Sequence, residues 1–254
     1  MITKLAEIFQ KYKTCPKECF IDGSPVREFI KKYSDDLYAK EIQTFISYQD
    51  YKPTQRGADL PWWGKRYFTG EDGFHVFIVA QDSNTLDAGS IVFFSSLFPH
   101  VETREQYKQY TSLLKPIGSS KRSFNFGSYI GIRNKLDDWG INKDFTYLTD
   151  AAKVYTYGSK KDNDFDWEKS SQLLQEEINI CKPNLIVLLG WKALRILDKK
   201  LNFKDCVDKH SFLQIVGKQV VVAPFLCGQG LGHSNFKKRF ENAKSLIKEA
   251  MDGK

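Results

Sequence analysis

Long apolar runs are missing from this sequence. No stretch approaches the roughly 20 consecutive apolar residues that a membrane-spanning helix requires. The first residues, MITKLAEIFQKYK, have a charged amphipathic pattern, which differs from the basic, apolar and small-residue regions of a signal peptide. We therefore expect a soluble, cytoplasmic protein that has no contact with a membrane.

Paired cysteines are also scarce. The chain has five cysteines, Cys15, Cys19, Cys181, Cys206 and Cys227, and an odd, scattered set argues against a disulfide framework. Only the first two lie close together. Since no second close pair supplies the further thiolates that a zinc ion or an iron–sulfur cluster needs, we expect no metal and no cofactor.

The glycine fingerprints of phosphate-binding loops, GxGxxG and GxxxxGKS, are absent as well. The segment GQGLG at 228–232 comes closest, but its spacing after the preceding apolar run is wrong. This argues against an α/β enzyme of nucleotide metabolism. The sequence has no internal repeat and no low-complexity segment.

The chain does have enough apolar residues to build a core. Its 254 residues are 41% hydrophobic and 14% aromatic, which suits one α/β domain, alone or with a helical extension. The net charge of +7 and the pI of about 9.0 favour a polyanionic partner such as nucleic acid. A modest basic excess is also a common solubility feature.

Three short apolar runs predict buried strands, at 74–80, 185–190 and 218–225, and a β-rich run at 144–164 predicts another. Helical patterns at 170–182 and 191–201 alternate with the later runs, as in βαβ units. We therefore predict a three-layer α/β/α fold with a central, mainly parallel four-stranded sheet. Residues 71–254 would form this domain.

Residues 1–70 are predicted to be a helical N-terminal extension, ending in an aromatic loop, that packs on the main domain. Ser24 before Pro25 is typical of a helix N-cap. The loop contains Trp62 and Trp63, close to basic residues, and has two interpretations. The tryptophans either stack on the bases of nucleic acid or close the core beside the first strand.

Polar residues follow three of the expected strands. Gln81 and Asp82 follow the first, Asp150 ends the second, and His233 lies in the turn after the last. In a parallel sheet these groups would meet at one edge, where ligands bind. Two carboxylates and a histidine suit general acid/base or electrostatic catalysis. The alternative is that Asp82 and His233 only cap neighbouring turns or helices.

Five short motifs occur in a familiar order: VAQDSN at 79–84, GSIVFFSS at 89–96, YLTDAAKVY at 147–155, KPNLIVLLGWKALRIL at 182–197 and GHSNF at 232–236. They resemble the motifs of the uracil-DNA glycosylase superfamily, over residues 74 to 250. The resemblance implies a monofunctional DNA glycosylase that hydrolyses the N-glycosidic bond of a flipped-out pyrimidine and leaves an abasic site.

The resemblance also implies site residues. Asp82 would position the attacking water and stabilise an oxocarbenium-like sugar, while His233 would donate a hydrogen bond to the departing base. The base-binding residues would be Gln81, Asn84, Phe94 and Asp150, with Phe94 or its neighbour Phe93 as the stacking wall. The partner would be DNA, either duplex with a flipped base or single-stranded, bound by a monomer.

The DNA-binding residues implied in this way are Ser234, Asn235, Phe236, Lys237 and Lys153. The first two would grip phosphates at the start of the last helix. The wedge that fills the vacated base stack would be Phe236, Leu231 or Lys237, and the sequence does not choose among them.

This chain departs from the family pattern at the base-reading position. Asp150 stands where asparagine is common, and an ionised carboxylate has no donor for O4 of uracil. It can accept from the exocyclic amine of a cytosine-like base. Ser83 replaces a proline of the family pattern and Asn84 a tyrosine, and the loss of the tyrosine suggests room at carbon 5 of the base. We therefore expect a modified cytosine as a candidate substrate, in repair or in defence against foreign DNA. The alternative function is a catalytically inactive protein of this fold that recognises lesions or modified DNA.

Overall fold

A computed structural model describes residues 1–15, 17–51, 57–82, 92, 95–112, 126–156, 164–227 and 230–253. The α-helices in these ranges are α1 (Ile2–Tyr12), α2 (Pro25–Lys32), α3 (Leu37–Ser47), α5 (Arg104–Ser112), α6 (Phe126–Asp138), α7 (Trp167–Cys181), α8 (Trp191–Leu197), α9 (Phe203–Asp208) and α10 (Phe236–Asp252). Short 3-10 helices occur at Lys17–Phe20, Ser95–Leu97 and Lys143–Phe145. The strands are β1 (Trp62–Trp63), β2 (Val76–Asp82), β3 (Thr146–Ala152), β4 (Leu185–Leu189), β5 (Leu213–Ile215) and β6 (Lys218–Ala223).

These strands form one mixed sheet in the order β1-β3-β2-β4-β6-β5. The four central strands, β3, β2, β4 and β6, are parallel, and they are the four that the sequence predicts. The edge strands β1 and β5 are antiparallel to their neighbours. The α/β class is confirmed, but the predicted count of four strands is wrong, because two- and three-residue edge strands are too short to show a periodic pattern.

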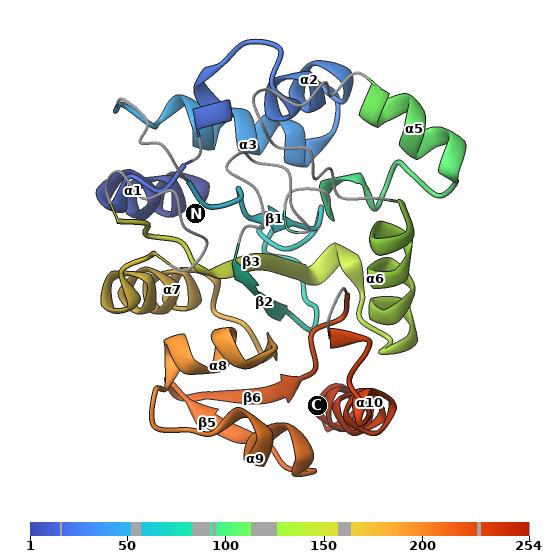
Figure 1. The fold of residues 1–254 in the computed structure, drawn as a ribbon. Helices are drawn as coiled ribbons and strands as arrows, with labels where there is room; N and C mark the ends of the chain where they lie inside the picture. Colours follow the sequence, from blue (N-terminus) through green and yellow to red (C-terminus); the bar gives the residue numbers. More distant parts are fainter. Residues whose placement is uncertain are drawn as a thin grey trace.

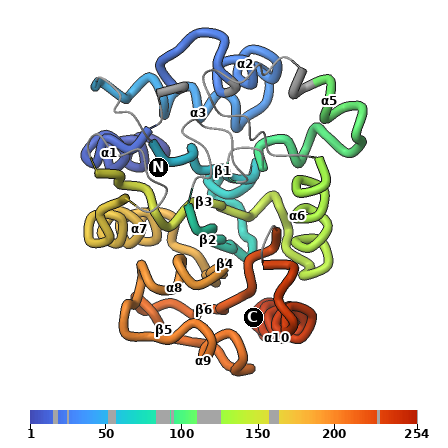
Figure 2. The backbone as a smooth tube through the Cα atoms, viewed as in Figure 1, coloured from blue at the N-terminus to red at the C-terminus, as the bar shows by residue number. Residues whose placement is uncertain are grey.

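Helices lie on both sides of the sheet, as a three-layer fold requires. Figure 1 shows α7 and α8 on one side and α6 and α10 on the other. The helices α2 and α3 lie beyond the β1 edge, and the tube in Figure 2 ends in α10 beside β6. No helix in the described ranges is long and apolar enough to cross a membrane.

The parallel strands are buried along most of their length. Every residue of β4 is buried, and so are the first five residues of β2, whereas its last two, Gln81 and Asp82, are partly exposed. Strands covered on both faces need continuous apolar runs, which explains why VFIVA and LIVLL carry no polar residue. The first five residues of β2 are therefore apolar and buried, and polar, partly exposed side chains begin at its carboxyl end.

The aromatic loop belongs to the core. Trp62 and Trp63 form β1 and are buried, as is Tyr67. The Trp63 ring packs edge-on against Tyr38 of α3, with 4.8 Å between ring centroids, and its indole N–H donates to Glu41. The core-closing interpretation is confirmed, and the sheet includes residues on both sides of position 70. The predicted cap is present too, since the Ser24 hydroxyl accepts a hydrogen bond from a backbone N–H of α2.

Candidate functional site

Two carboxyl groups meet at the carboxyl ends of the parallel strands. In the register of β2 and β3, Ala80 lies opposite Asp150 and Asp82 lies opposite Ala152. Because side chains alternate between the two faces of a strand, Asp82 and Asp150 lie on the same face of the sheet. The structure therefore brings together the two acidic residues that the sequence singles out.

Asp150 is fully buried, and neither oxygen of its carboxyl group has a hydrogen-bond partner in the part of the chain that the structure describes. Burial raises the pKa of Asp150 well above its usual value, and the nearby carboxylates of Asp59 and Asp82 raise it further. Lys153 and Lys192 oppose this shift more weakly. The structure therefore favours the protonated acid, which has one O–H donor and one carbonyl acceptor.

Asp82 lies in a different environment. Its Oδ2 is 2.8 Å from the Nζ of Lys192, and the two side chains are 19% and 7% exposed, respectively. Lys192 is the second residue of α8, so the turn that follows β4 delivers its ammonium group to the end of β2. This ion pair fixes the position of the Asp82 carboxylate while leaving it partly open to solvent.

The turn after β4 depends on Gly190. This residue has φ +87°, and a Cβ atom there would lie 2.9 Å from the side-chain amide carbon of Gln81, so a side chain would be both strained and crowded. The Gln81 Oε1 in turn accepts a hydrogen bond of 3.4 Å from the backbone N–H of Lys192. Gln81 therefore holds the start of α8 against β2 through its Oε1, and its predicted role in base binding stays a prediction.

Sequence reasoning missed Lys192 and Asp59. The sequence does contain a signal for Lys192. This lysine follows LIVLLG, and that predicted strand is the only one of the four to whose end no functional residue is assigned from the sequence. Asp59 is buried in the segment before β1 and interacts electrostatically with Asp150. No local pattern marks it, because its proximity to Asp150 arises only when β1 pairs with β3.

Lys153 does not contact DNA as predicted. The side chain is fully buried, its Nζ donates to the Thr149 hydroxyl over 2.9 Å, and it forms an ion pair with Glu177 of α7. Thr149 and Lys153 lie on the face of β3 opposite Asp150. The predicted DNA contact at Lys153 is therefore wrong, because this lysine is part of the packing between β3 and α7.

The predicted residues before and within α10 remain near the surface. The exposed ones are Leu231, His233, Ser234, Asn235 and Lys237. The backbone carbonyl of His233 accepts a hydrogen bond from the N–H of Phe236, whose ring packs 5.8 Å from that of Phe240. Asn235 precedes α10, but its side chain does not cap the helix. Their predicted roles at DNA stay predictions, and Asn84 and Phe94 lie outside the described residues.

Comparison of the sequence with protein-family models and with curated proteins gives no match. Within the described ranges, no group of three or more His, Cys, Asp or Glu side chains is arranged to hold a metal ion. The fold and the site thus define an α/β protein with one partly exposed and one buried carboxyl group at the edge where parallel α/β sheets bind ligands.

Proposed function

We propose that this chain is a DNA glycosylase that hydrolyses the N-glycosidic bond of a flipped-out pyrimidine and leaves an abasic site. The observation that supports this proposal is the position of Asp82 and Asp150 on the same face of two adjacent strands. Two carboxyl groups in contrasting environments are typical of sites in which one acts as an anion and the other as a hydrogen-bond donor.

Asp82 is assigned to the sugar. When the bond between C1′ and the base breaks, the electron pair leaves with the base, and positive charge develops on the sugar ring. A carboxylate beside the ring stabilises that charge and orients the water whose oxygen then bonds to C1′. The ion pair with Lys192 would hold the Asp82 carboxylate in the required orientation.

Asp150 is assigned to the base, and its protonated form changes the expected specificity. The neutral acid can accept from N3–H and donate to O4 of uracil, as an asparagine amide does. It can equally donate to N3 of cytosine and accept from the exocyclic amine. We therefore propose that Asp150 admits uracil-like and cytosine-like bases, whereas the ionised carboxylate would favour an amine-bearing base alone.

The test is base excision from oligonucleotides that each contain one uracil, cytosine or 5-substituted cytosine, both single-stranded and in duplex. Alkaline cleavage of the resulting abasic strand measures the product. We expect release of at least one of these bases by the unmodified protein and a loss of at least about 100-fold in Asp82→Asn. Asp138→Asn is the matched control, because Asp138 is a surface carboxylate of α6 that pairs with Lys244.

Two results would contradict the proposal. Release of no base from any of these substrates would exclude the activity. Full activity in Asp82→Asn would exclude the mechanism. DNA binding without base release would instead favour a catalytically inactive protein of this fold that recognises lesions or modified DNA.

A further inference from the structure

Two tryptophans are exposed at the same edge of the molecule. Trp62, Trp63 and Trp139 are buried, whereas Trp167 is 37% exposed and Trp191 is 45% exposed. The exposed pair begins α7 and α8, and its ring centroids lie 6.3 Å apart with an interplanar angle of 35°. Neighbouring exposed aromatic rings are more typical of a contact surface than of a solvated one.

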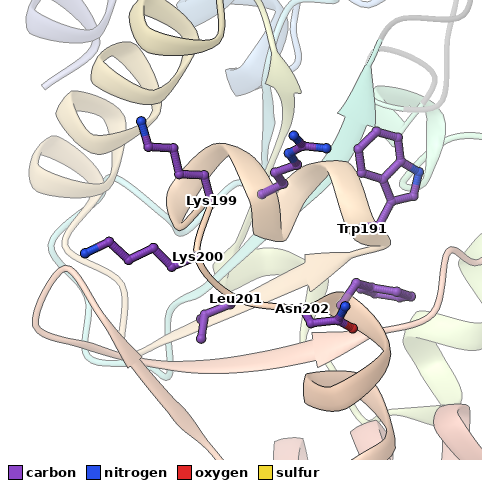
Figure 3. Close-up of a pocket in the computed structure, with 7 residues that line it drawn as sticks. Trp191, Lys199, Lys200, Leu201 and Asn202 are labelled. Carbon is purple, nitrogen blue, oxygen red and sulfur yellow. The ribbon is translucent and has the colours of Figure 1, made fainter.

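Basic side chains surround these two rings. The guanidinium carbon of Arg195 lies 5.3 Å from the Trp167 ring centroid, and the Lys192 Nζ lies 5.8 Å from that of Trp191. A groove of about 330 Å³ extends along α8 from Trp191 past Arg195 to Lys199 and Lys200. Figure 3 shows Trp191 at the start of α8 and the two lysines beyond its end.

The charge of this surface favours an anionic ligand. Residues 191–205 contain five basic side chains and two acidic ones, and the whole chain carries a net charge of +7. An acidic peptide would use the charges but would leave the flat indole faces without a planar partner. Nucleobases are planar and stack on such rings, while their phosphates pair with arginine and lysine, which is the pattern of single-strand binding surfaces.

We propose that Trp167, Trp191 and Arg195 form a platform for single-stranded DNA, on which bases stack while phosphates contact Arg195 and the lysines of the groove. The platform goes beyond base excision, because it uses neither Asp82 nor Asp150 and requires no modified base. Trp191 is adjacent in sequence to Lys192, the partner of Asp82. A strand bound on the platform therefore lies beside the candidate site.

The first test is fluorescence anisotropy with a labelled 12-nucleotide oligothymidylate and the full chain, at several salt concentrations. We expect Trp191→Ala to weaken binding about 5- to 150-fold, the range for loss of one stacked base. Arg195→Ala is expected to weaken it and to reduce the salt dependence by about one phosphate contact. Lys248→Ala, which removes one exposed charge from α10, is the control and should change affinity by less than about 2-fold.

The second test uses the tryptophans as their own probes. Oligothymidylate should quench the fluorescence of the unmodified protein, and the double variant Trp167→Phe with Trp191→Phe should lose that quenching. The three buried tryptophans that remain would report whether this variant is folded. This measurement needs no assumption about catalysis.

Unchanged affinity in the platform variants would overturn the proposal. So would equal competition by an oligoglutamate peptide, or self-association of the protein through this surface. Failure of the platform is distinguishable from failure of the glycosylase proposal. A protein that binds oligothymidylate through Trp191 but releases no base refutes only the glycosylase, and base release with unchanged binding in Trp191→Ala refutes only the platform.

Discussion

Asp150 and Lys153 lie three residues apart near the end of β3, both fully buried, and their surroundings differ completely. Lys153 forms an ion pair with Glu177 and donates to Thr149, and Glu177 also accepts hydrogen bonds from Tyr147 and Thr149. Asp150 has no hydrogen-bond partner among the described residues. A buried polar group whose partners are all supplied by the chain stabilises the fold, whereas one without partners is available to a ligand.

Breaking the Lys153 network should have the largest effect. In Glu177→Leu the ammonium group of Lys153 stays buried without its counter-ion, and burial already lowers the pKa of that lysine. We expect the free energy of unfolding, measured in urea, to fall by about 3–5 kcal/mol. The double variant Lys153→Met with Glu177→Leu should recover most of this loss. A loss below about 1 kcal/mol in the single variant would mean that the network is not structural.

His233→Ala should affect activity without affecting stability, because the residue is exposed before α10. If His233 donates a hydrogen bond to the departing base, base excision should fall about 10²- to 10³-fold, as for loss of one donor to a developing anion. The free energy of unfolding should change by less than about 0.5 kcal/mol. His210→Ala, at another exposed histidine, is the control. Unchanged excision in His233→Ala would remove the role that the resemblance assigns to this residue.

Lys192→Met tests whether the ion pair positions Asp82. The variant keeps most of the side chain but not its charge, so the carboxylate can rotate. We expect base excision to fall about 100-fold, the cost of misplacing a reacting group by about 1 Å. Lys244→Met is the matched control, because Lys244 pairs with the surface residue Asp138 over 2.7 Å. Equal activity in both variants would show that Asp82 needs no fixed partner.

Much of the fold follows from the sequence because the parallel strands are buried on both faces. VFIVA and LIVLL are recognisable as strands without any tertiary information, and the position of Asp82 and Asp150 at strand ends follows from parallel pairing. The edge strands cannot be predicted from the sequence in this way, because β1 is only two residues long and its pairing with β3 depends on distant parts of the chain.

The errors at the site have separate physical reasons. Alternation along β3 puts Lys153 on the face opposite Asp150, so the sequence contains a signal against a DNA contact, whereas the resemblance implies one. The pKa of Asp150 depends on burial and on Asp59, neither of which a local pattern reveals. The sequence predicts a helix that begins at Trp191, but the exposure of this side chain depends on how α8 packs.

Asp150→Asn gives the most specific prediction. The folded state raises the pKa of Asp150 above the unfolded value of about 4, so the folded protein holds a proton that the unfolded chain releases. The stability that this group contributes is therefore fully present below about pH 4. As the pH rises toward the folded pKa, the free energy of unfolding falls by at most about 1.4 kcal/mol per pH unit. Asparagine does not ionise, so urea unfolding should show the variant gaining on the unmodified protein as pH rises from 4 to 7.

The control for this prediction has the opposite sign. The hydrogen bonds from Arg239 lower the pKa of Asp208, so the stability that this group contributes is present above the unfolded pKa and is lost as the pH falls through the folded one. Asp208→Asn should therefore lose stability relative to the unmodified protein at pH 7 and approach it at low pH. Asp150→Asn could instead lose stability relative to the unmodified protein at pH 7, as Asp208→Asn does, or show no pH dependence. Either result would mean that Asp150 is ionised at pH 7. The assignment of a neutral acid that binds both uracil-like and cytosine-like bases would then be wrong.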